Sequence, residues 1–305
     1  MSSNSTQSEP WTILRLLQWT TEHLKKHGSP SARLDAEVLL AHARGCQRID
    51  LYAAFNEEPP EAVKAIFRDL IKRRAAGEPV AYLVGKKEFY SLSFKVTPDC
   101  LIPRGETEHV VIEALDRLKP MRTSGEETGS EIHVVDVCTG SGCIAVALAK
   151  ETAKFQPRVH FTAIDLSPAA LAIAQENATT HGVTDRVAFV HADLLDSVAD
   201  ASAQFILSNP PYVSQSEFES LDRSVRLHEP HMALVSGPTG MEIIERLIDQ
   251  SANKLAANGW LILELSPMIA SAALQRLQSD SRWKDSHLKR DLAGHDRIAI
   301  AQRSA

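Results

Sequence analysis

From Ile132 onward, the chain alternates short apolar segments with longer segments of helical periodicity. Near-continuous apolar segments are typical of strands that are buried on both faces of a parallel sheet. Alternating strands and helices predict an α/β fold, in which a doubly wound, mostly parallel sheet lies between two layers of helices. The predicted strands span residues 133–137, 159–164, 187–190, 205–208, 260–265 and 297–301, and the predicted helices span residues 144–150, 169–181, 241–255 and 269–278.

The part of the chain before residue 105 has a different pattern. Apolar residues recur at helical spacing in three stretches of residues 11–80, which predicts a small bundle of three or four helices. Residues 1–10 are polar and are predicted to form a disordered tail. Aromatic residues within 81–104 predict a hairpin that links the bundle to an α/β domain of residues 105–305. The polar residues 121–130 predict a loop within that domain.

Composition and charge disfavour several classes of protein. The 305 residues carry a net charge of −6, whereas proteins that coat nucleic acid usually present a basic face. No apolar run is long enough to span a bilayer, and the first ten residues lack the order of a secretory signal. The four cysteines form no CxxC pair and no zinc pattern, so we expect reduced thiols, a cytoplasmic protein and no metal site. These cysteines are Cys46, Cys100, Cys138 and Cys143.

A glycine-containing loop follows the first predicted strand of the α/β domain. Its residues are Cys138, Thr139, Gly140, Ser141 and Gly142, and an alanine-rich helix comes directly after them. Glycines let the backbone turn tightly and approach a ligand, and the helix start offers free N–H groups. The third glycine of the dinucleotide fingerprint is missing, but the order of strand, loop and helix still predicts a nucleotide-like ligand here.

Two acidic residues end the next two predicted strands. An acid at the position of Asp165 is typical of a group that binds ribose hydroxyls, although it also suits the helix start at Ser167-Pro168. Asp193 and Leu194 form a corner that is predicted to flank an adenine ring, and an ordinary turn acid remains the alternative. A cofactor with an adenosine but no pyrophosphate, such as S-adenosylmethionine, fits this set of residues.

A rigid corner follows the fourth predicted strand, at Asn209, Pro210, Pro211 and Tyr212. Two prolines can continue neither a helix nor a central strand, so the corner is expected to be stiff and exposed. The Asn209 side-chain oxygen and the Pro210 carbonyl are placed to accept the two N–H groups of a planar amide and to aim its nitrogen at a methyl donor. Tyr212 is expected to pack against the planar group. The alternative is a turn without chemistry.

Together, the glycine loop and the corner resemble the class I methyltransferases that act on planar nitrogen. Four further segments, at 33–37, 78–83, 101–108 and 291–297, make nearly the whole chain after Trp11 resemble the HemK-type peptide chain release factor glutamine methyltransferases. The resemblance implies a Rossmann-like methyltransferase domain, the cofactor S-adenosylmethionine, the product S-adenosylhomocysteine, and a substrate glutamine in the Gly-Gly-Gln motif of release factors. The N-terminal helices would then help to recognise the release factor.

The resemblance also implies roles for individual residues. Catalysis is assigned to Asn209, Pro210 and Tyr212, and the substrate glutamine to these three with Pro211. Cofactor contacts are assigned to the loop 138–142 and to Asp165, Asp193, Leu194 and Asn209.

The chain departs from the family pattern at several positions. Cys138 and Gly105 stand where glycine and proline are usual, Leu194 stands where an aromatic residue is common, and Ser266 replaces a common glycine. Three alternative functions remain open at this point. They are methylation of a glutamine of ribosomal protein L3, N6-methylation of adenine in DNA, and binding of S-adenosylmethionine without catalysis.

Overall fold

The computed structural model describes residues 10–121, 131–156 and 158–305. Residues 1–9 of the predicted tail and residues 122–130 of the predicted loop lie outside this part of the chain. The chain forms two compact units, one up to Gly85 and one from Lys86 to Ala305. No described helix is both long enough and apolar enough to cross a bilayer.

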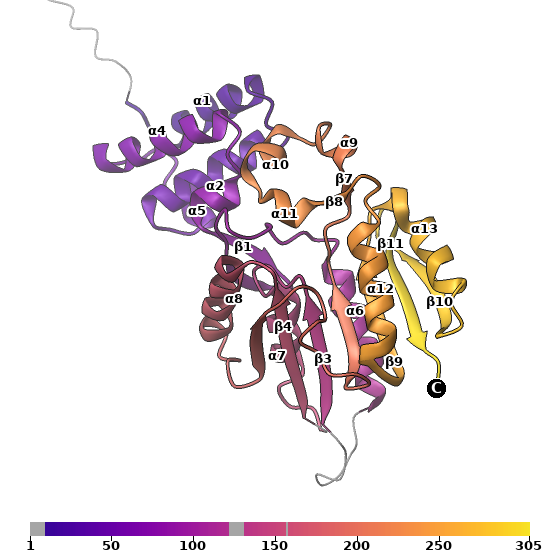
Figure 1. Ribbon diagram of the computed structural model, residues 1–305. Coiled ribbons are helices and arrows are strands. Elements are labelled where there is room, and N and C mark those ends of the chain that lie inside the picture. Colours follow the sequence, from indigo (N-terminus) through magenta and orange to yellow (C-terminus); the bar gives the residue numbers. More distant parts are fainter. Residues whose placement is uncertain (1–9, 122–130, 157) are drawn as a thin grey trace, which may run out of the picture. The chain divides into compact units, whose positions relative to one another are not determined.

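The first unit is built from helices, as predicted (Figure 1). Its core is formed by apolar side chains such as Leu17, Leu39 and Phe67, and Thr12 caps the first helix by accepting a hydrogen bond from the Arg15 N–H. Gly45 ends the second helix in the left-handed conformation, with φ of 69°. The helices of the described residues are α1 (Ile13–Lys26), α2 (Ala32–Arg44), α3 (Arg48–Ala53), α4 (Glu61–Ala75) and α5 (Val80–Val84).

The second unit contains a seven-stranded sheet with the order β10-β11-β9-β6-β3-β4-β5. Five neighbouring strands are parallel, and β11 is antiparallel to β9 and β10 on either side of it. The prediction of a doubly wound, mostly parallel sheet is therefore confirmed. The strands are β3 (Ile132–Val137), β4 (Val159–Asp165), β5 (Val187–His191), β6 (Ala203–Ser208), β9 (Leu255–Glu264), β10 (Trp283–Arg290) and β11 (Asp296–Arg303).

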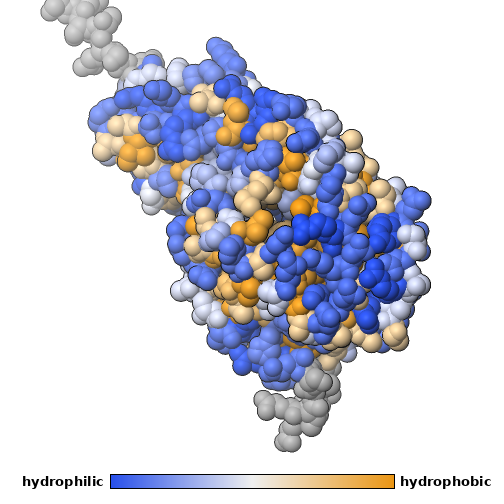
Figure 2. Space-filling model, viewed as in Figure 1, coloured by the Kyte–Doolittle hydropathy of each residue, from blue (hydrophilic) through white to orange (hydrophobic). Residues whose placement is uncertain are grey.

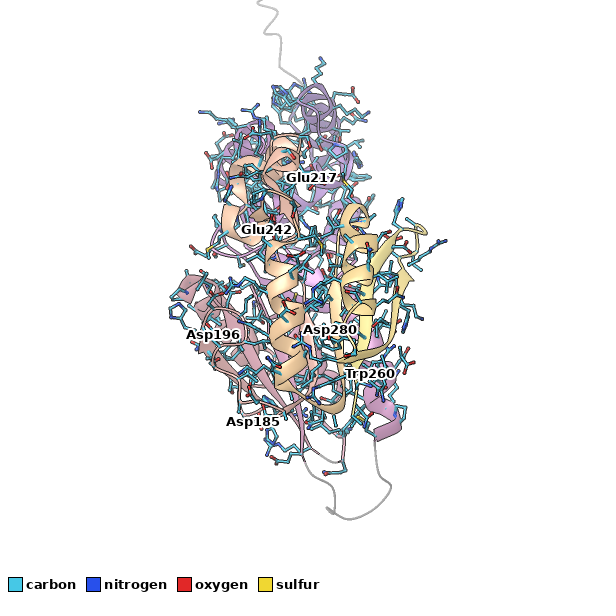
Figure 3. The ribbon with its side chains drawn as sticks, turned by 45° about the vertical axis from the view of Figure 1, so that its right-hand side comes forward. Asp185, Asp196, Glu217, Glu242, Trp260 and Asp280 are labelled. Carbon is cyan, nitrogen blue, oxygen red and sulfur yellow. The ribbon has the colours of Figure 1, made fainter. Side chains whose placement is uncertain are left out.

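Helices cover both faces of this sheet because side chains alternate along each strand. Val134 belongs to a core with α6 (Glu108–Leu118) and α7 (Cys143–Glu151), whereas its neighbour Val135 belongs to a core with α12 (Glu242–Lys254) and α13 (Pro267–Gln278). Helix α8 (Pro168–Thr180) follows β4. Trp260 of β9 is labelled in Figure 3, and the Arg117 guanidinium lies over its ring, 4.6 Å from the ring centroid.

The structure contains elements that periodicity did not predict. Helix α6 and strand β10 were not predicted, nor were the short elements between β6 and α12. The predicted hairpin is present, and its residues Phe89 and Phe94 lie in the core of the second unit. The hairpin strands are β1 (Lys86–Phe89) and β2 (Leu92–Lys95), and the 3-10 helix η1 (Lys119–Met121) follows α6. The short elements between β6 and α12 are β7 (Val213–Ser214), α9 (Gln215–Phe218), α10 (Arg223–His228), α11 (His231–Leu234) and β8 (Val235–Gly237).

Candidate active site

A cavity opens at the carboxyl ends of the parallel strands. The chain runs from β3 through β4 to β5 on one side, and then returns to β6 on the other side of β3. Ligands of open α/β sheets bind at such a reversal point. The cavity is lined by predicted site residues together with residues that were not predicted site residues, among them Asp99, Cys100, Leu101, Pro230, Met232 and Ala233. The predicted residues on its wall are Cys138, Gly140, Asp165, Asp193, Leu194, Asn209 and Pro211.

The glycine loop needs the left-handed backbone conformation at three positions. The φ angles are 58° at Cys138, 55° at Gly140 and 80° at Gly142. A Cβ on Gly142 would come within 3.0 Å of the Ala174 Cβ, whereas a Cβ on Gly140 would meet no protein atom within 4 Å. Cys138 adopts a conformation that costs a residue with a Cβ roughly 1–2 kcal/mol. A glycine, which the family resemblance implies at this position, would avoid this cost.

Asp165 connects the end of β4 to the glycine loop. Its Oδ2 accepts a hydrogen bond from the Gly140 N–H at 2.8 Å, and its Oδ1 accepts one from the Ser167 N–H at 2.9 Å. Burial raises the pKa of this carboxyl, while the backbone hydrogen bonds act in the opposite direction. Each carboxylate oxygen has two lone pairs, so Asp165 can hold the loop and still accept hydrogen bonds from a ligand. Asp165 therefore also supports the start of α8, which was the alternative role for this residue. Ribose binding by Asp165 stays a prediction.

Asp136 lies beneath the loop and is fully buried. Its Oδ2 accepts hydrogen bonds from the Thr139 hydroxyl at 2.6 Å and from the Ala145 N–H at 3.1 Å. Burial raises the pKa of Asp136 from 3.8 to about 7. Thr139 is therefore directed at Asp136, while the Ser141 carbonyl accepts a hydrogen bond from the Asn177 side chain at 2.9 Å. Thr139, Ser141 and Gly142 support the loop and do not line the cavity.

Replacing Asp136 with Asn should change how stability depends on pH. Because the pKa of Asp136 is raised in the folded state, its contribution to stability is present below pH 4 and is lost as the pH rises towards 7. The loss is up to about 4 kcal/mol, because the pKa of Asp136 rises from 3.8 to about 7 and a pKa difference of one corresponds to about 1.36 kcal/mol. We expect the free energy of unfolding of Asp136→Asn, relative to the unsubstituted protein, to rise between pH 4 and pH 8 in denaturant titrations. A difference in unfolding free energy that stays constant with pH would contradict a raised pKa at Asp136. The matched control is Asp185→Asn, at an exposed aspartate.

Asp193 and Leu194 line the cavity in different ways. The Asp193 carboxylate accepts a hydrogen bond from the Arg246 guanidinium at 2.7 Å, and both side chains are about half exposed. Leu194 is buried in the core beside α12 and has a φ of 50°. The ion pair on Asp193 agrees with the turn-acid alternative, and contact of the two residues with an adenine ring stays a prediction.

The corner after β6 is held by hydrogen bonds from both sides. The Ser208 hydroxyl donates to the Val137 carbonyl at 2.6 Å, which joins the ends of β6 and β3. The Asn209 side-chain NH₂ donates to the Thr107 hydroxyl oxygen at 3.0 Å. Asn209 and Pro211 line the cavity, whereas Pro210 is buried and is not part of its wall. The corner thus presents the Asn209 amide at the cavity while its backbone is fixed from behind.

Tyr212 has a different position from the one expected for a residue that packs on the substrate. Its hydroxyl donates to the Glu264 carboxylate at 3.2 Å, and its ring packs against the core beside α12. It does not line the cavity. Burial and the nearby Glu264 charge raise the pKa of Tyr212 above its ordinary value. The hydroxyl therefore stays protonated and anchors the corner to the end of β9.

Sequence reasoning overlooked the residues that support this wall. Thr107 and Glu264 contact the corner, and Glu229 holds the segment before α6 by accepting hydrogen bonds from the Ile102 N–H at 3.2 Å and the Arg104 guanidinium at 2.5 Å. The only sequence signal for Thr107 and Arg104 was their place in the segment 101–108, which was singled out for its resemblance. Nothing local in the sequence marked Glu229, and Glu264 was marked only as the start of the segment 264–266, in which Ser266 replaces a common glycine.

The fold and the cavity define a class I methyltransferase. Among solved structures, the catalytic domain of hMettl16 in complex with MAT2A 3′UTR hairpin 1 has the same fold, with a TM-score of 0.54 and 16% identity over 77% of this chain and 80% of that chain. The family models for the PrmC N-terminal domain and for the methyltransferase small domain match residues 15–85 and 121–226.

Two relatives identify the family. The release factor glutamine methyltransferase of Rhodopirellula baltica is 49% identical over 99% of both chains. The protein of the same name from Nitratidesulfovibrio vulgaris is 39% identical over 96% of both chains. The chain belongs to the release factor glutamine methyltransferases, and the family resemblance seen in its motifs is confirmed.

Proposed function

We propose that this protein transfers a methyl group from S-adenosylmethionine to the side-chain amide nitrogen (N5) of the glutamine in the Gly-Gly-Gln motif of peptide chain release factors. Membership in the family supports the reaction and its substrate. The observation that carries the proposal is the Asn209 amide on the cavity wall, whose NH₂ group is bound by Thr107. We also propose a cytoplasmic location, which a release factor substrate supports.

The residues around the cavity suit S-adenosylmethionine. Gly140 leaves open space where a side chain would stand, and the nearby Asp165 carboxylate supplies acceptors for ribose hydroxyls. Ile164, Leu194 and Ile243 give the cavity the apolar walls that an adenine ring requires. When bound, the cofactor supplies an electrophilic methyl group on a sulfonium. The residues proposed to hold it are the loop 138–142, Asp165, Asp193, Leu194 and Asn209, with Thr139, Ser141 and Gly142 acting through the shape of the loop.

The corner supplies orientation for the substrate. An amide nitrogen is a poor nucleophile because its lone pair is delocalised into the carbonyl. We expect the Asn209 side-chain oxygen and the Pro210 carbonyl to accept the two N–H groups of the glutamine. The glutamine nitrogen would then face the methyl carbon of the donor. Fixing reactants in line contributes roughly 7–11 kcal/mol in favourable cases. The cofactor held by the proposed residues would supply the methyl group and would leave as S-adenosylhomocysteine, and the proton that the glutamine nitrogen exchanges for the methyl group would pass to solvent.

The reaction can be tested on the proposed substrate and the two alternative substrates together. Release factor, ribosomal protein L3 and DNA would each be incubated with the enzyme and a labelled methyl donor. We expect label in the release factor, and mass spectrometry should place 14 Da on the Gly-Gly-Gln glutamine, the mass that replacing N–H by N–CH₃ adds. Label in L3 alone or in DNA alone would show that the enzyme methylates that substrate and not the release factor. Cofactor binding without label in any of the three would indicate a binding module.

The first unit is proposed to recognise the release factor outside the glutamine itself. A groove of about 760 Å³ lies between α1 and α4. One wall carries Trp19 and His23, whose rings stack with their centroids 4.9 Å apart, and the other carries the cations Arg68 and Lys72. Figure 2 shows an apolar patch over α4 among hydrophilic side chains. Aromatic and basic walls suit an apolar side chain of the release factor that has acidic neighbours.

Replacing Trp19 with Ala should weaken use of the protein substrate. Trp19 is 53% exposed, so its loss removes contact area without opening the helical core. We expect KM for the release factor to rise by about tenfold, because an aromatic anchor contributes at least about 1.4 kcal/mol at an interface. The dissociation constant for S-adenosylmethionine should not change. The control is Ile49→Ala, at another exposed apolar residue that lies outside the groove. Equal KM values for the two variants would contradict a role of the groove in binding the release factor.

A further inference from the structure

A buried glutamate joins two segments of the cavity wall that are distant in the sequence. Glu229 lies between α10 and α11, and its side chain is 1% exposed. Its Oε2 accepts a hydrogen bond from the Ile102 N–H at 3.2 Å, and its Oε1 accepts one from the Arg104 guanidinium at 2.5 Å. Leu101 and Pro230, the chain neighbours of Ile102 and Glu229, both line the cavity. One carboxylate thus connects two parts of the same wall.

We propose that Glu229 is a positioning residue, which holds the wall segments 99–101 and 230–233 at the spacing that S-adenosylmethionine requires. This inference rests on the proposed function, and specifically on its cofactor. Glu229 does not line the cavity itself, so it acts through the residues beside it.

Both wall segments need such a contact because regular secondary structure does little to hold them. Residues 101–104 form neither helix nor strand, and α11, which follows Pro230, has only four residues. Backbone groups outside helices and sheets must find their partners among side chains or water. Ile102 is buried, and its N–H meets the Glu229 carboxylate instead of solvent. The carboxylate therefore supplies order that a helix or a sheet would otherwise provide.

Glu229 is itself held firmly. Its N–H donates to the Val225 carbonyl at 3.0 Å, at the end of α10. Pro230 restricts the residue before it to an extended conformation, and Glu229 has φ of −89° and ψ of 151°. The charge of its carboxylate is balanced by Arg104, and charge-assisted hydrogen bonds are stronger than neutral ones. A fixed backbone and two occupied oxygens make this side chain a rigid link.

The segment 99–101 is also anchored from its other end, by Asn177 of α8. The Asn177 side chain accepts a hydrogen bond from the Lys95 N–H at 2.7 Å and donates one to the Lys95 carbonyl at 3.0 Å. It also donates to the Ser141 carbonyl of the glycine loop at 2.9 Å. These contacts do not involve Glu229. We therefore expect loss of the Glu229 carboxylate to loosen the cavity end of the segment and to leave the hairpin folded.

Glu229→Gln tests the link with little change in size. The NH₂ group of a glutamine only donates, so it would face one of the two donors, Ile102 or Arg104, without forming a hydrogen bond. We expect the dissociation constant for S-adenosylmethionine, measured by calorimetry, to rise by about tenfold. The matched control is Glu219→Gln, because Glu219 also pairs with an arginine, Arg226 at 3.2 Å, but is 75% exposed. The control should leave the dissociation constant unchanged.

Cys100 gives a second readout, which needs no cofactor. It lines the cavity, is 1% exposed, and burial raises the pKa of its thiol to about 11. The thiolate is the reactive form, so Cys100 should react slowly with iodoacetamide at about pH 8. We expect alkylation of Cys100, followed by mass spectrometry, to be at least about tenfold faster in Glu229→Gln than in Glu219→Gln. Cys46 of the first unit should react equally in both and serves as the internal standard.

The two readouts separate a positioning role from a purely structural one. A Glu229→Gln protein with the cofactor affinity of Glu219→Gln would overturn the inference, and so would an unchanged rate of Cys100 alkylation. A lower melting temperature with both readouts unchanged would likewise assign Glu229 to folding alone. An unsubstituted protein that binds S-adenosylmethionine but methylates no release factor would overturn the proposed function and leave the inference intact. If Glu229→Gln does not fold, Arg104→Ala removes the more exposed donor and should shift both readouts in the same direction.

Discussion

Asn209→Ala is expected to lower the kcat for methyl transfer to release factor by at least about 10²-fold, the loss that follows removal of one preorganised hydrogen-bonding group in an active site. The substitution removes the acceptor that orients the glutamine nitrogen. It leaves the glycine loop and Asp165, which are held by their own hydrogen bonds, in place. Binding of S-adenosylmethionine, measured by calorimetry, should therefore change only a few-fold, and kcat is measured with a labelled methyl donor.

The matched control is Asn253→Ala. Asn253 is an exposed residue of α12 and does not line the cavity, so its loss should affect neither kcat nor cofactor binding. An Asn209→Ala enzyme that turns over like the Asn253→Ala enzyme would rule out a catalytic amide at the corner. Loss of cofactor binding in Asn209→Ala to the same extent as the loss of kcat would assign Asn209 to the cofactor instead of the substrate.

Asp165→Ala is expected to weaken binding of S-adenosylmethionine by at least about tenfold, because a hydrogen bond to a charged group contributes about 1.5–3 kcal/mol. The change removes the proposed acceptor for the ribose hydroxyls. It also releases the Gly140 and Ser167 N–H groups, which the carboxylate holds at 2.8 and 2.9 Å. At saturating cofactor, kcat should fall less than it does in Asn209→Ala. Calorimetry and a kinetic titration of the cofactor measure the two effects.

Asp196→Ala is the control for Asp165. Asp196, which is labelled in Figure 3, follows β5 and does not line the cavity, and its carboxylate accepts a hydrogen bond from the Gln250 side chain at 3.0 Å. The two variants differ in whether the lost acid lines the cavity. Should Asp165→Ala bind the cofactor as tightly as Asp196→Ala and only unfold at a lower temperature, Asp165 would be a support for the loop and for α8 alone.

The parallel strands and the glycine loop were predictable because their signals are local. The predicted strand at 159–164 corresponds to β4 (Val159–Asp165), and the predicted helix at 269–278 corresponds to α13 (Pro267–Gln278). Strand β10 lacks that signal, since its sequence from Trp283 to Arg290 is mostly polar. Among the described strands it lies at the edge of the sheet beside β11, and its pairing with β11 has two shifts of register. Its strand conformation is therefore set by its partner.

What the sequence determined by itself was the fold class and the chemistry of the residues at the carboxyl ends of the strands. Hydrophobic periodicity and the conformational limits of glycine and proline act over a few neighbouring residues, so they can be read along the chain. Tertiary structure alone decided which way Asn209 points and what holds it. Thr107 is 102 residues from Asn209, and Glu264 is 52 residues from Tyr212. Their contacts exist because the sheet brings the ends of distant segments together, and no local pattern records such proximity.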